Sequence, residues 1–298
     1  MTSDDTTRTL RRRLETGPLL VVPGAANALT ARVIEDLGFE AVYVTGAGVA
    51  NTYLGVPDIG MVTLTELAAN VAAIRDVVDI PIIVDADTGF GNAINIRRTV
   101  SVLERAGADA LQFEDQVEPK RCGHFEGKEL VSVGQMAQKL RAARAARRND
   151  DLVLIARTDA RAVEGFESAV DRLRRYVEAG ADVTFLEAPE TAEEVLAVPG
   201  LVDVPQLINL VEGGKTPLLP LTELASFRIA LFANLALQAA VHGMQAALTV
   251  LRELESFPPA DMVAPWSERQ RLVGKDYYDA LSRRYADDSN GDTEGAAS

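Results

Sequence analysis

Two aspartates with the spacing of a cation site follow a short apolar segment. Asp85 and Asp87 stand two residues apart, directly after residues 81–84, whose isoleucines and valine predict a buried strand. In an extended chain, residues i and i+2 point to the same side, so the two carboxylates are expected to converge where the strand ends. Two carboxylates held together need a cation between them or a proton on one of them. The pair therefore indicates a hard-cation site; a helix-capping aspartate beside a solvated loop aspartate is the alternative.

Polar side chains also end or follow most of the other apolar segments. They are Tyr43, Thr45, Asp58, Glu114, Arg157, Glu187 and Asn209. With Asp85 and Asp87, Glu114 makes an oxygen-rich set that suits Mg²⁺, or Mn²⁺ in its place. Zinc fits less well because the chain has only two histidines and one cysteine. The guanidinium of Arg157 can donate two hydrogen bonds to a substrate carboxylate. The alternative for the whole set of polar residues is a chance series of capping residues.

The only cysteine lies in a basic stretch, Lys120-Arg121-Cys122-Gly123-His124. Positive neighbours lower the pKa of a thiol and favour the thiolate. Such a cysteine can act as a nucleophile, or as a donor and acceptor of protons. The alternative is an inert thiol in a basic surface loop.

Eight apolar segments have the composition of strands. They are residues 19–22, 41–44, 81–84, 109–113, 152–156, 183–186, 205–208 and 228–232. Helical patterns alternate with most of them, which predicts an α/β fold, a (β/α)8 barrel of the TIM type. A doubly wound sheet would alternate in the same way, but its nucleotide-binding glycine fingerprint is not matched here. In a barrel, catalytic residues gather at the carboxyl ends of the strands, where the polar residues above stand.

Capping residues and turn formers place the remaining elements. Helices are expected to start at Asn27, at Thr63 with Glu66, at Ser132 with Gln135, and at Thr191 with Glu194. Residues 117–131 are expected to form a long mobile loop, and residues 233–254 a long apolar helix. A further helix is expected over 267–285, with Trp266, Tyr277 and Tyr278 as packing residues. These features predict one barrel domain with a C-terminal helical extension over 1–285, and a disordered tail over 286–298.

The composition excludes several classes of protein. The chain has 298 residues, of which 47% are hydrophobic and 25% are charged, as in ordinary globular proteins. Its net charge of −14 argues against nucleic acid as a main partner. No apolar run is long enough to predict a membrane span, and no apolar leader follows the first methionine. A single cysteine allows no disulfide within the chain, which favours a cytoplasmic location.

Several motifs over roughly residues 15–255 together resemble the isocitrate lyase/phosphoenolpyruvate mutase superfamily. They are Tyr43-Val44-Thr45-Gly46, Leu54-Gly55-Val56-Pro57-Asp58-Ile59-Gly60, Asp85-Ala86-Asp87-Thr88-Gly89-Phe90-Gly91-Asn92, Phe113-Glu114-Asp115-Gln116, Lys120-Arg121-Cys122-Gly123-His124, Ala156-Arg157-Thr158-Asp159-Ala160, and Asn209-Leu210-Val211-Glu212-Gly213-Gly214-Lys215-Thr216-Pro217. The resemblance implies a modified barrel in which a helix after the last strand is exchanged between the subunits of a homodimer or homotetramer.

The resemblance also implies roles for individual residues. Mg²⁺ would be held by Asp85, Asp87 and Glu114. A hydroxy or keto dicarboxylate would be the small-molecule partner, and loop 117–131 would close over it. Its binding residues would be Thr45, Gly46, Ala47, Gly123, Arg157 and Asn209. The catalytic set would comprise Tyr43, Asp58, Lys120, Cys122, His124 and Glu187, with Tyr43 or Asp58 as the base and Cys122 as the acid.

Within the superfamily, the loop around Cys122 resembles that of the carbon–carbon lyases, such as the methylisocitrate and 2-alkylmalate lyases. Phe125 stands where methylisocitrate lyases tend to have arginine, which weakens the case for a tricarboxylate substrate. A carboxyphosphoenolpyruvate or phosphoenolpyruvate mutase that forms a phosphorus–carbon bond is an alternative. So is an oxaloacetate decarboxylase. A barrel that binds metabolites without turnover is the least favoured.

Overall fold

The computed structural model describes residues 3–121, 123 and 127–286. It divides into two compact units, Met1–Val241 and His242–Ser298.

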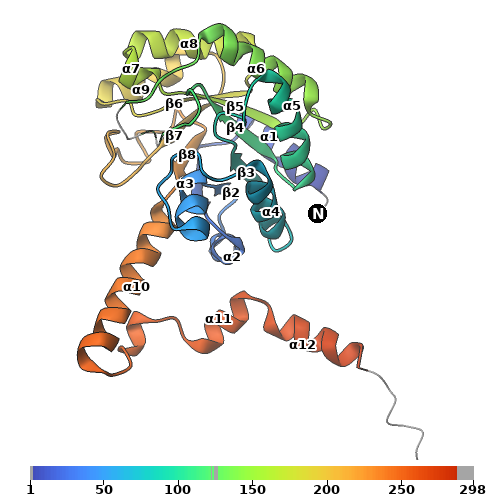
Figure 1. Ribbon diagram of the computed structural model, residues 1–298, viewed down its shortest axis with the longest axis vertical. Coiled ribbons are helices and arrows are strands. Elements are labelled where there is room, and N and C mark those ends of the chain that lie inside the picture. Colours follow the sequence, from blue (N-terminus) through green and yellow to red (C-terminus); the bar gives the residue numbers. More distant parts are fainter. Residues whose placement is uncertain (1–2, 122, 124–126, 287–298) are drawn as a thin grey trace, which may run out of the picture. The chain divides into compact units, whose positions relative to one another are not determined.

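Eight parallel strands close the first unit into a barrel (Figure 1). The strands are β1 Leu20–Ala25, β2 Val42–Val44, β3 Ile82–Asp85, β4 Ala110–Glu114, β5 Val153–Thr158, β6 Val183–Leu186, β7 Gln206–Asn209 and β8 Ile229–Phe232. Each strand pairs with the next in sequence, and the pair Leu20 with Ile229 joins β8 to β1. The predicted (β/α)8 barrel is confirmed, and the doubly wound sheet is wrong.

Several strands run further than predicted at their carboxyl ends. β3 ends at Asp85, β4 at Glu114 and β7 at Asn209, so these polar residues are the last residues of the strands themselves. The first strand, predicted over residues 19–22, continues through Pro23 and Gly24 to Ala25. Gly24 lies so close to β8 that a Cβ atom there would be 1.9 Å from the carbonyl oxygen of Ala233, and only glycine allows this approach.

Helices surround the barrel, and four of them start at the predicted caps. They are α1 Ser3–Thr16, α2 Ala28–Asp36, α3 Gly46–Val49, a π-helix Ala50–Leu54, α4 Leu64–Arg75, α5 Ala93–Arg105, α6 Val133–Ala146, α7 Ala160–Val163, α8 Phe166–Glu178 and α9 Ala192–Leu201. Asn27, Thr63, Ser132 and Thr191 each cap a helix through the side chain, as predicted. The helical turns directly after β2 were not predicted.

Two apolar clusters hold the barrel together. The larger lies between the strands and the surrounding helices. The smaller fills the barrel interior and includes Leu10 and Leu14 of α1, which pack with inward-facing strand residues such as Ile83 and Ile155. The interior is therefore a packed core, as in other barrels of this kind. A functional site can form at the polar carboxyl ends of the strands.

The second unit is helical. α10 Leu235–Leu254 begins in the first unit and continues into the second, where it is followed by a 3₁₀ turn Ala260–Met262, α11 Trp266–Leu272 and α12 Lys275–Arg284. The single helix predicted over 267–285 is wrong, because the chain breaks at Gly274, which has a φ of 69°. Trp266 is 66% exposed in the single chain, contrary to its expected packing role. None of the described helices is both long and apolar enough to cross a membrane.

Candidate active site

Asp85 and Asp87 converge beside the start of α3. A Cβ atom built on Gly46 would lie 3.1 Å from Oδ1 of Asp87 and 3.2 Å from Oδ2 of Asp85. Glycine at position 46 therefore lets the backbone approach both carboxylates. Asp87 reaches this position with a φ of 48°, in the left-handed region that aspartate tolerates better than most residues.

Two protein cations lie among the carboxylates. The ammonium nitrogen of Lys120 is 2.9 Å from Oδ1 of Asp87 and 2.5 Å from Oδ1 of Asp58. Nε of Arg157 is 3.4 Å from Oε2 of Glu114. Within residues 3–121, 123 and 127–286, no three His, Cys, Asp or Glu side chains are gathered closely enough to hold a metal ion as they stand. Two of the predicted ligands are thus paired with protein cations: Asp87 with Lys120, and Glu114 with Arg157.

Burial changes the proton affinity of these carboxyl groups. Burial raises the pKa of Asp87 to about 6, although the ammonium of Lys120 acts in the opposite direction. Burial also raises the pKa of Glu114 well above its usual value, against the attraction of Arg157 and Lys120. Positive charge placed among these oxygens is therefore strongly favoured.

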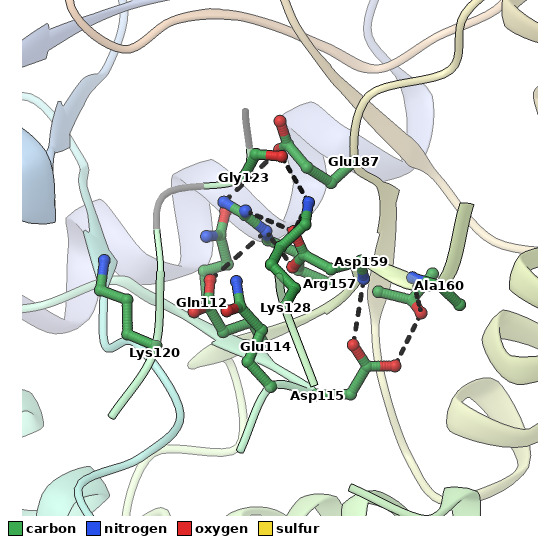
Figure 2. Close-up of polar contacts among 12 residues, drawn as sticks. Gln112, Glu114, Asp115, Lys120, Gly123, Lys128, Arg157, Asp159, Ala160 and Glu187 are labelled. Carbon is green, nitrogen blue, oxygen red and sulfur yellow. Dashed lines mark hydrogen bonds and ion pairs between the residues drawn. The ribbon is translucent and has the colours of Figure 1, made fainter. Parts of the chain in front are cut away.

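Arg157, near the end of β5, is held as a rigid plane on one side of the site (Figure 2). Its Nε and Nη2 donate to the two carboxylate oxygens of Asp159 at 2.9 and 3.0 Å. Nη1 lies 3.4 Å from Oε2 of Glu187, and the guanidinium carbon lies 5.3 Å from the ring centroid of Phe185. This fixed fork is suited to a planar carboxylate.

Lys128 ties the basic loop to Arg157 through Asp159. Its ammonium donates to the Gly123 carbonyl oxygen and lies 2.9 Å from Oδ1 of Asp159 (Figure 2). Burial opposes ionisation of Asp159, but Arg157 and Lys128 prevail and lower its pKa to about 2. A Cβ atom on Gly123 would be 2.3 Å from Nη2 of Arg157, so glycine is needed where the loop meets the site.

Asp115 anchors the outer side of this arrangement. It follows Glu114 at the end of β4 and accepts hydrogen bonds from the hydroxyls of Thr158 and Tyr176, both at 2.7 Å, and from the Asp159 backbone at 3.0 Å. Nη1 of Arg172 on α8 lies 3.2 Å from the same carboxylate. Asp115 therefore fixes the two residues that directly follow Arg157.

The β2 end forms the opposite side of the site. The hydroxyl of Thr45 accepts a hydrogen bond from the Gly48 backbone at 3.2 Å and donates to Oδ1 of Asn234 at 3.1 Å. Tyr43 is buried and donates to Asp85, and burial raises the pKa of its phenol well above 10. Tyr43 is therefore a proton donor in this arrangement.

One small cavity opens between these groups. Its lining includes ten of the predicted site residues: Tyr43, Thr45, Ala47, Asp58, Asp85, Lys120, Gly123, Arg157, Glu187 and Asn209. Gly46 and Glu114 contact lining residues, and Asp87 faces a neighbouring cavity beside Lys120. Cys122, His124 and Phe125 lie outside the described residues.

Several contributors were missed from the sequence. The cavity also contains Arg121, Phe185, Val211, Leu231, Ala233 and Asn234. Phe185 and Leu231 could have been found from strand alternation, because each precedes a strand end by one residue and is buried. No comparable local pattern in the sequence predicted that Asn234, Lys128 and Asp159 would contribute to the site.

Replacing Lys128 by methionine is expected to lower the free energy of unfolding by about 3 kcal/mol, because a buried ion pair is broken and Asp159 loses a partner. The matched control is Lys275→Met, which removes an exposed pair with Asp279 and is expected to cost less than about 1 kcal/mol. Urea unfolding followed by circular dichroism measures both. Equal losses in the two variants would contradict the role given to the buried pair.

Comparison with known sequences relates the whole barrel to enzymes of one family. A family model described as phosphoenolpyruvate phosphomutase matches residues 10–252. The chain is 41% identical to 2,3-dimethylmalate lyase of Eubacterium barkeri over 285 residues, covering 95% of this chain and 99% of that protein. It is 48% identical to 2-methylisocitrate lyase of Aeropyrum pernix over 247 residues, covering 82% of this chain and 78% of that protein.

Solved structures give the same relation. A crystal structure of 2,3-dimethylmalate lyase superposes with a TM-score of 0.89 at 36% identity, covering 99% of both chains. A phosphonopyruvate hydrolase in complex with oxalate and Mg²⁺ superposes with a TM-score of 0.85 at 31% identity, covering 96% of this chain and 99% of that one.

Proposed function

The chain belongs to the phosphoenolpyruvate phosphomutase family, and we propose that it is a Mg²⁺-dependent carbon–carbon lyase that cleaves a 2-hydroxy dicarboxylate into pyruvate and a second carboxylate. The family relation predicted from the sequence motifs is confirmed. The observation that carries the proposal is that Asp85, the fixed Arg157 and the basic loop residue Lys120 line the same cavity. Such a site can hold an anionic substrate between a cation site and a carboxylate fork.

Asp85, Asp87 and Glu114 would hold the Mg²⁺ ion, and Mn²⁺ could replace it. The donors fit a hard cation: two carboxylates converge beside Gly46, and the buried Oε1 of Glu114 has no hydrogen-bond partner among the described residues. When bound, the ion would supply positive charge that stabilises the oxygens of the keto acid.

The substrate would lie between the two sides of the cavity. Arg157 and the backbone at Thr45, Gly46 and Ala47 would bind the carboxylate of the pyruvate half, since backbone N–H groups at a helix start favour an anion. Gly123 brings the loop backbone against Arg157, and Asn209 lines the same cavity. This would fix the substrate in one orientation.

Cleavage needs a base and an acid on opposite parts of the substrate. Tyr43 and Asp58 both line the cavity, but Asp58 is the better base, because burial raises the pKa of the Tyr43 phenol well above 10 and the phenol keeps its proton. The base takes the hydroxyl proton, the C–C bond breaks, and its electron pair passes to the leaving carbon next to a carboxylate. Lys120, His124 and Glu187 would stabilise or position the charged groups.

The leaving carbon then needs a proton, which Cys122 would supply. This role comes from the sequence, where the thiol lies among positive residues. Exclusion of water by the loop would protect the carbanion until that transfer occurs. Undiminished cleavage by a Cys122→Ser variant would overturn the role of the thiol.

A 2-alkylmalate is the preferred substrate class. Val211 and Leu231 give the cavity an apolar side, and Phe125 replaces the positive charge that a third carboxylate would need. The test compares pyruvate release from 2,3-dimethylmalate and from 2-methylisocitrate, with Mg²⁺ present. Higher kcat/KM for the tricarboxylate would overturn the substrate class. In a separate incubation with carboxyphosphoenolpyruvate or phosphoenolpyruvate, phosphonate formation detected by phosphorus NMR would indicate a mutase instead.

We further propose that the protein is a cytoplasmic homodimer or homotetramer formed by exchange of α10. Apolar side chains along and after this helix are exposed in the single chain, including Leu248 at 62% and Phe257 at 78%. Exposed apolar surface of this extent is typical of an interface. Light scattering after size-exclusion chromatography should give a mass of two or four chains, and a monomer mass would contradict this assembly.

A further inference from the structure

Lys139 is a buried lysine that no step of the proposed reaction uses. It lies on α6 and is only 7% exposed, whereas lysine is rarely buried in this way. Its ammonium donates to the backbone carbonyl oxygen of Thr88 at 2.8 Å. Burial lowers the pKa of Lys139, against the attraction of Glu118 and Glu114. Burying a charged group is costly unless it has a hydrogen-bond partner, and the carbonyl oxygen of Thr88 is that partner for Lys139.

The carbonyl that Lys139 binds belongs to a strained turn. Asp87, Gly89 and Phe90 have φ values of 48°, 90° and 58°, and two of these three residues are not glycine. Such backbone conformations are unfavourable for residues other than glycine and persist only where the surroundings hold them. This turn is the one that carries the Asp87 carboxylate to its position beside Asp85.

The backbone carbonyls of the turn accept hydrogen bonds from several different elements. The Glu114 backbone N–H donates to the Asp87 carbonyl at 2.9 Å, and the Thr99 hydroxyl donates to the Gly89 carbonyl at 2.9 Å. Lys139 binds the carbonyl between these two, that of Thr88. Among these three donors, Lys139 alone carries a full charge, and charge-assisted hydrogen bonds are roughly twice as strong as neutral ones.

We propose that Lys139 is a positioning residue for the cation site: its ammonium holds the Thr88 carbonyl and thereby keeps the Asp87 carboxylate aimed at the point where Asp85 also points. The role rests on the proposed Mg²⁺ site. A second link supports it, because the Thr88 hydroxyl donates to Glu118 in the loop after β4. The turn is thus held from α6 and from the loop together.

The test is a calorimetric titration of the metal-free full-length protein with Mg²⁺, without substrate. Lys139→Met is expected to weaken Mg²⁺ binding by about 10- to 100-fold, the usual cost of removing a group that orients a metal ligand. Lys139→Arg keeps a charged donor and should restore most of the affinity. Arg75→Met is the matched control: it also removes a cation that donates to backbone carbonyls, those of Val78 and Ile80, but it lies before β3 and does not contact the turn, so it should change the affinity by less than about 3-fold.

Circular dichroism first shows that each variant folds, and Lys139→Gln replaces Lys139→Met if the latter does not. Mg²⁺ binding by Lys139→Met that equals wild type would overturn the positioning role alone. Equal weakening in Lys139→Met and Arg75→Met would overturn it too, because general loosening of the barrel then explains both. A wild-type protein that binds no Mg²⁺ would overturn the proposed function together with this inference.

Discussion

Replacing Asp87 by asparagine is expected to lower kcat/KM for pyruvate formation by at least about 100-fold and to raise the Mg²⁺ concentration needed for half-maximal activity. Asparagine has the same shape and also tolerates the φ of 48° at this position, so the backbone turn should persist. Only the negative charge next to Asp85 is removed. Steady-state rates over a Mg²⁺ series measure both effects.

The control for this change is Asp76→Asn, which alters an exposed carboxylate at the end of α4 and should leave the rates unchanged. Thermal unfolding of both variants separates loss of activity from loss of structure. Wild-type kcat/KM in Asp87→Asn at low Mg²⁺ would contradict the assignment of Asp87 as a ligand.

The second large effect is expected for Arg157→Lys, which should lower kcat/KM by about 100-fold or more. Lysine keeps the positive charge but cannot donate twice to Asp159, reach Glu187 and Glu114, and lie over Phe185 at the same time. Because the guanidinium plane is also the proposed fork for the substrate carboxylate, KM should rise as well as kcat fall.

Arg172→Lys is the matched control. Arg172 also contacts a buried carboxylate, that of Asp115, but it does not line the cavity. Its replacement should reduce the free energy of unfolding while leaving KM within about 3-fold of wild type. If Arg157→Lys changed only stability, or if both variants changed KM equally, Arg157 would not be the substrate fork.

The sequence allowed the barrel to be predicted because its signals are local. Each strand is a short apolar run, and caps such as Thr63 and Ser132 act within three residues of themselves. Convergence of Asp85 and Asp87 also followed from local geometry, since the period of a strand is two residues. The break at Gly274 was missed although glycine is a common helix end, because an apolar pattern continues on both sides of it.

The supports of the site could not be predicted, since they join residues far apart in sequence. Thr45 and Asn234 are 189 residues apart, and Lys139 and Thr88 are 51 apart. Nothing near Lys139 distinguishes it from the solvated lysines of an ordinary helix. The position of Lys120 between Asp58 and Asp87 likewise depends on how three separate loops meet. Such contacts are decided by tertiary packing.

The proposed reaction is tested most directly by analysing the products formed from 2,3-dimethylmalate and Mg²⁺ in D₂O. Cleavage between C2 and C3, followed by proton transfer to the leaving carbon, predicts equal amounts of pyruvate and propionate, with one deuterium at C2 of the propionate. Removal of the metal with EDTA should stop the reaction, and added Mg²⁺ should restore it. Absence of pyruvate, or cleavage that continues undiminished in EDTA, would contradict a Mg²⁺-dependent carbon–carbon lyase.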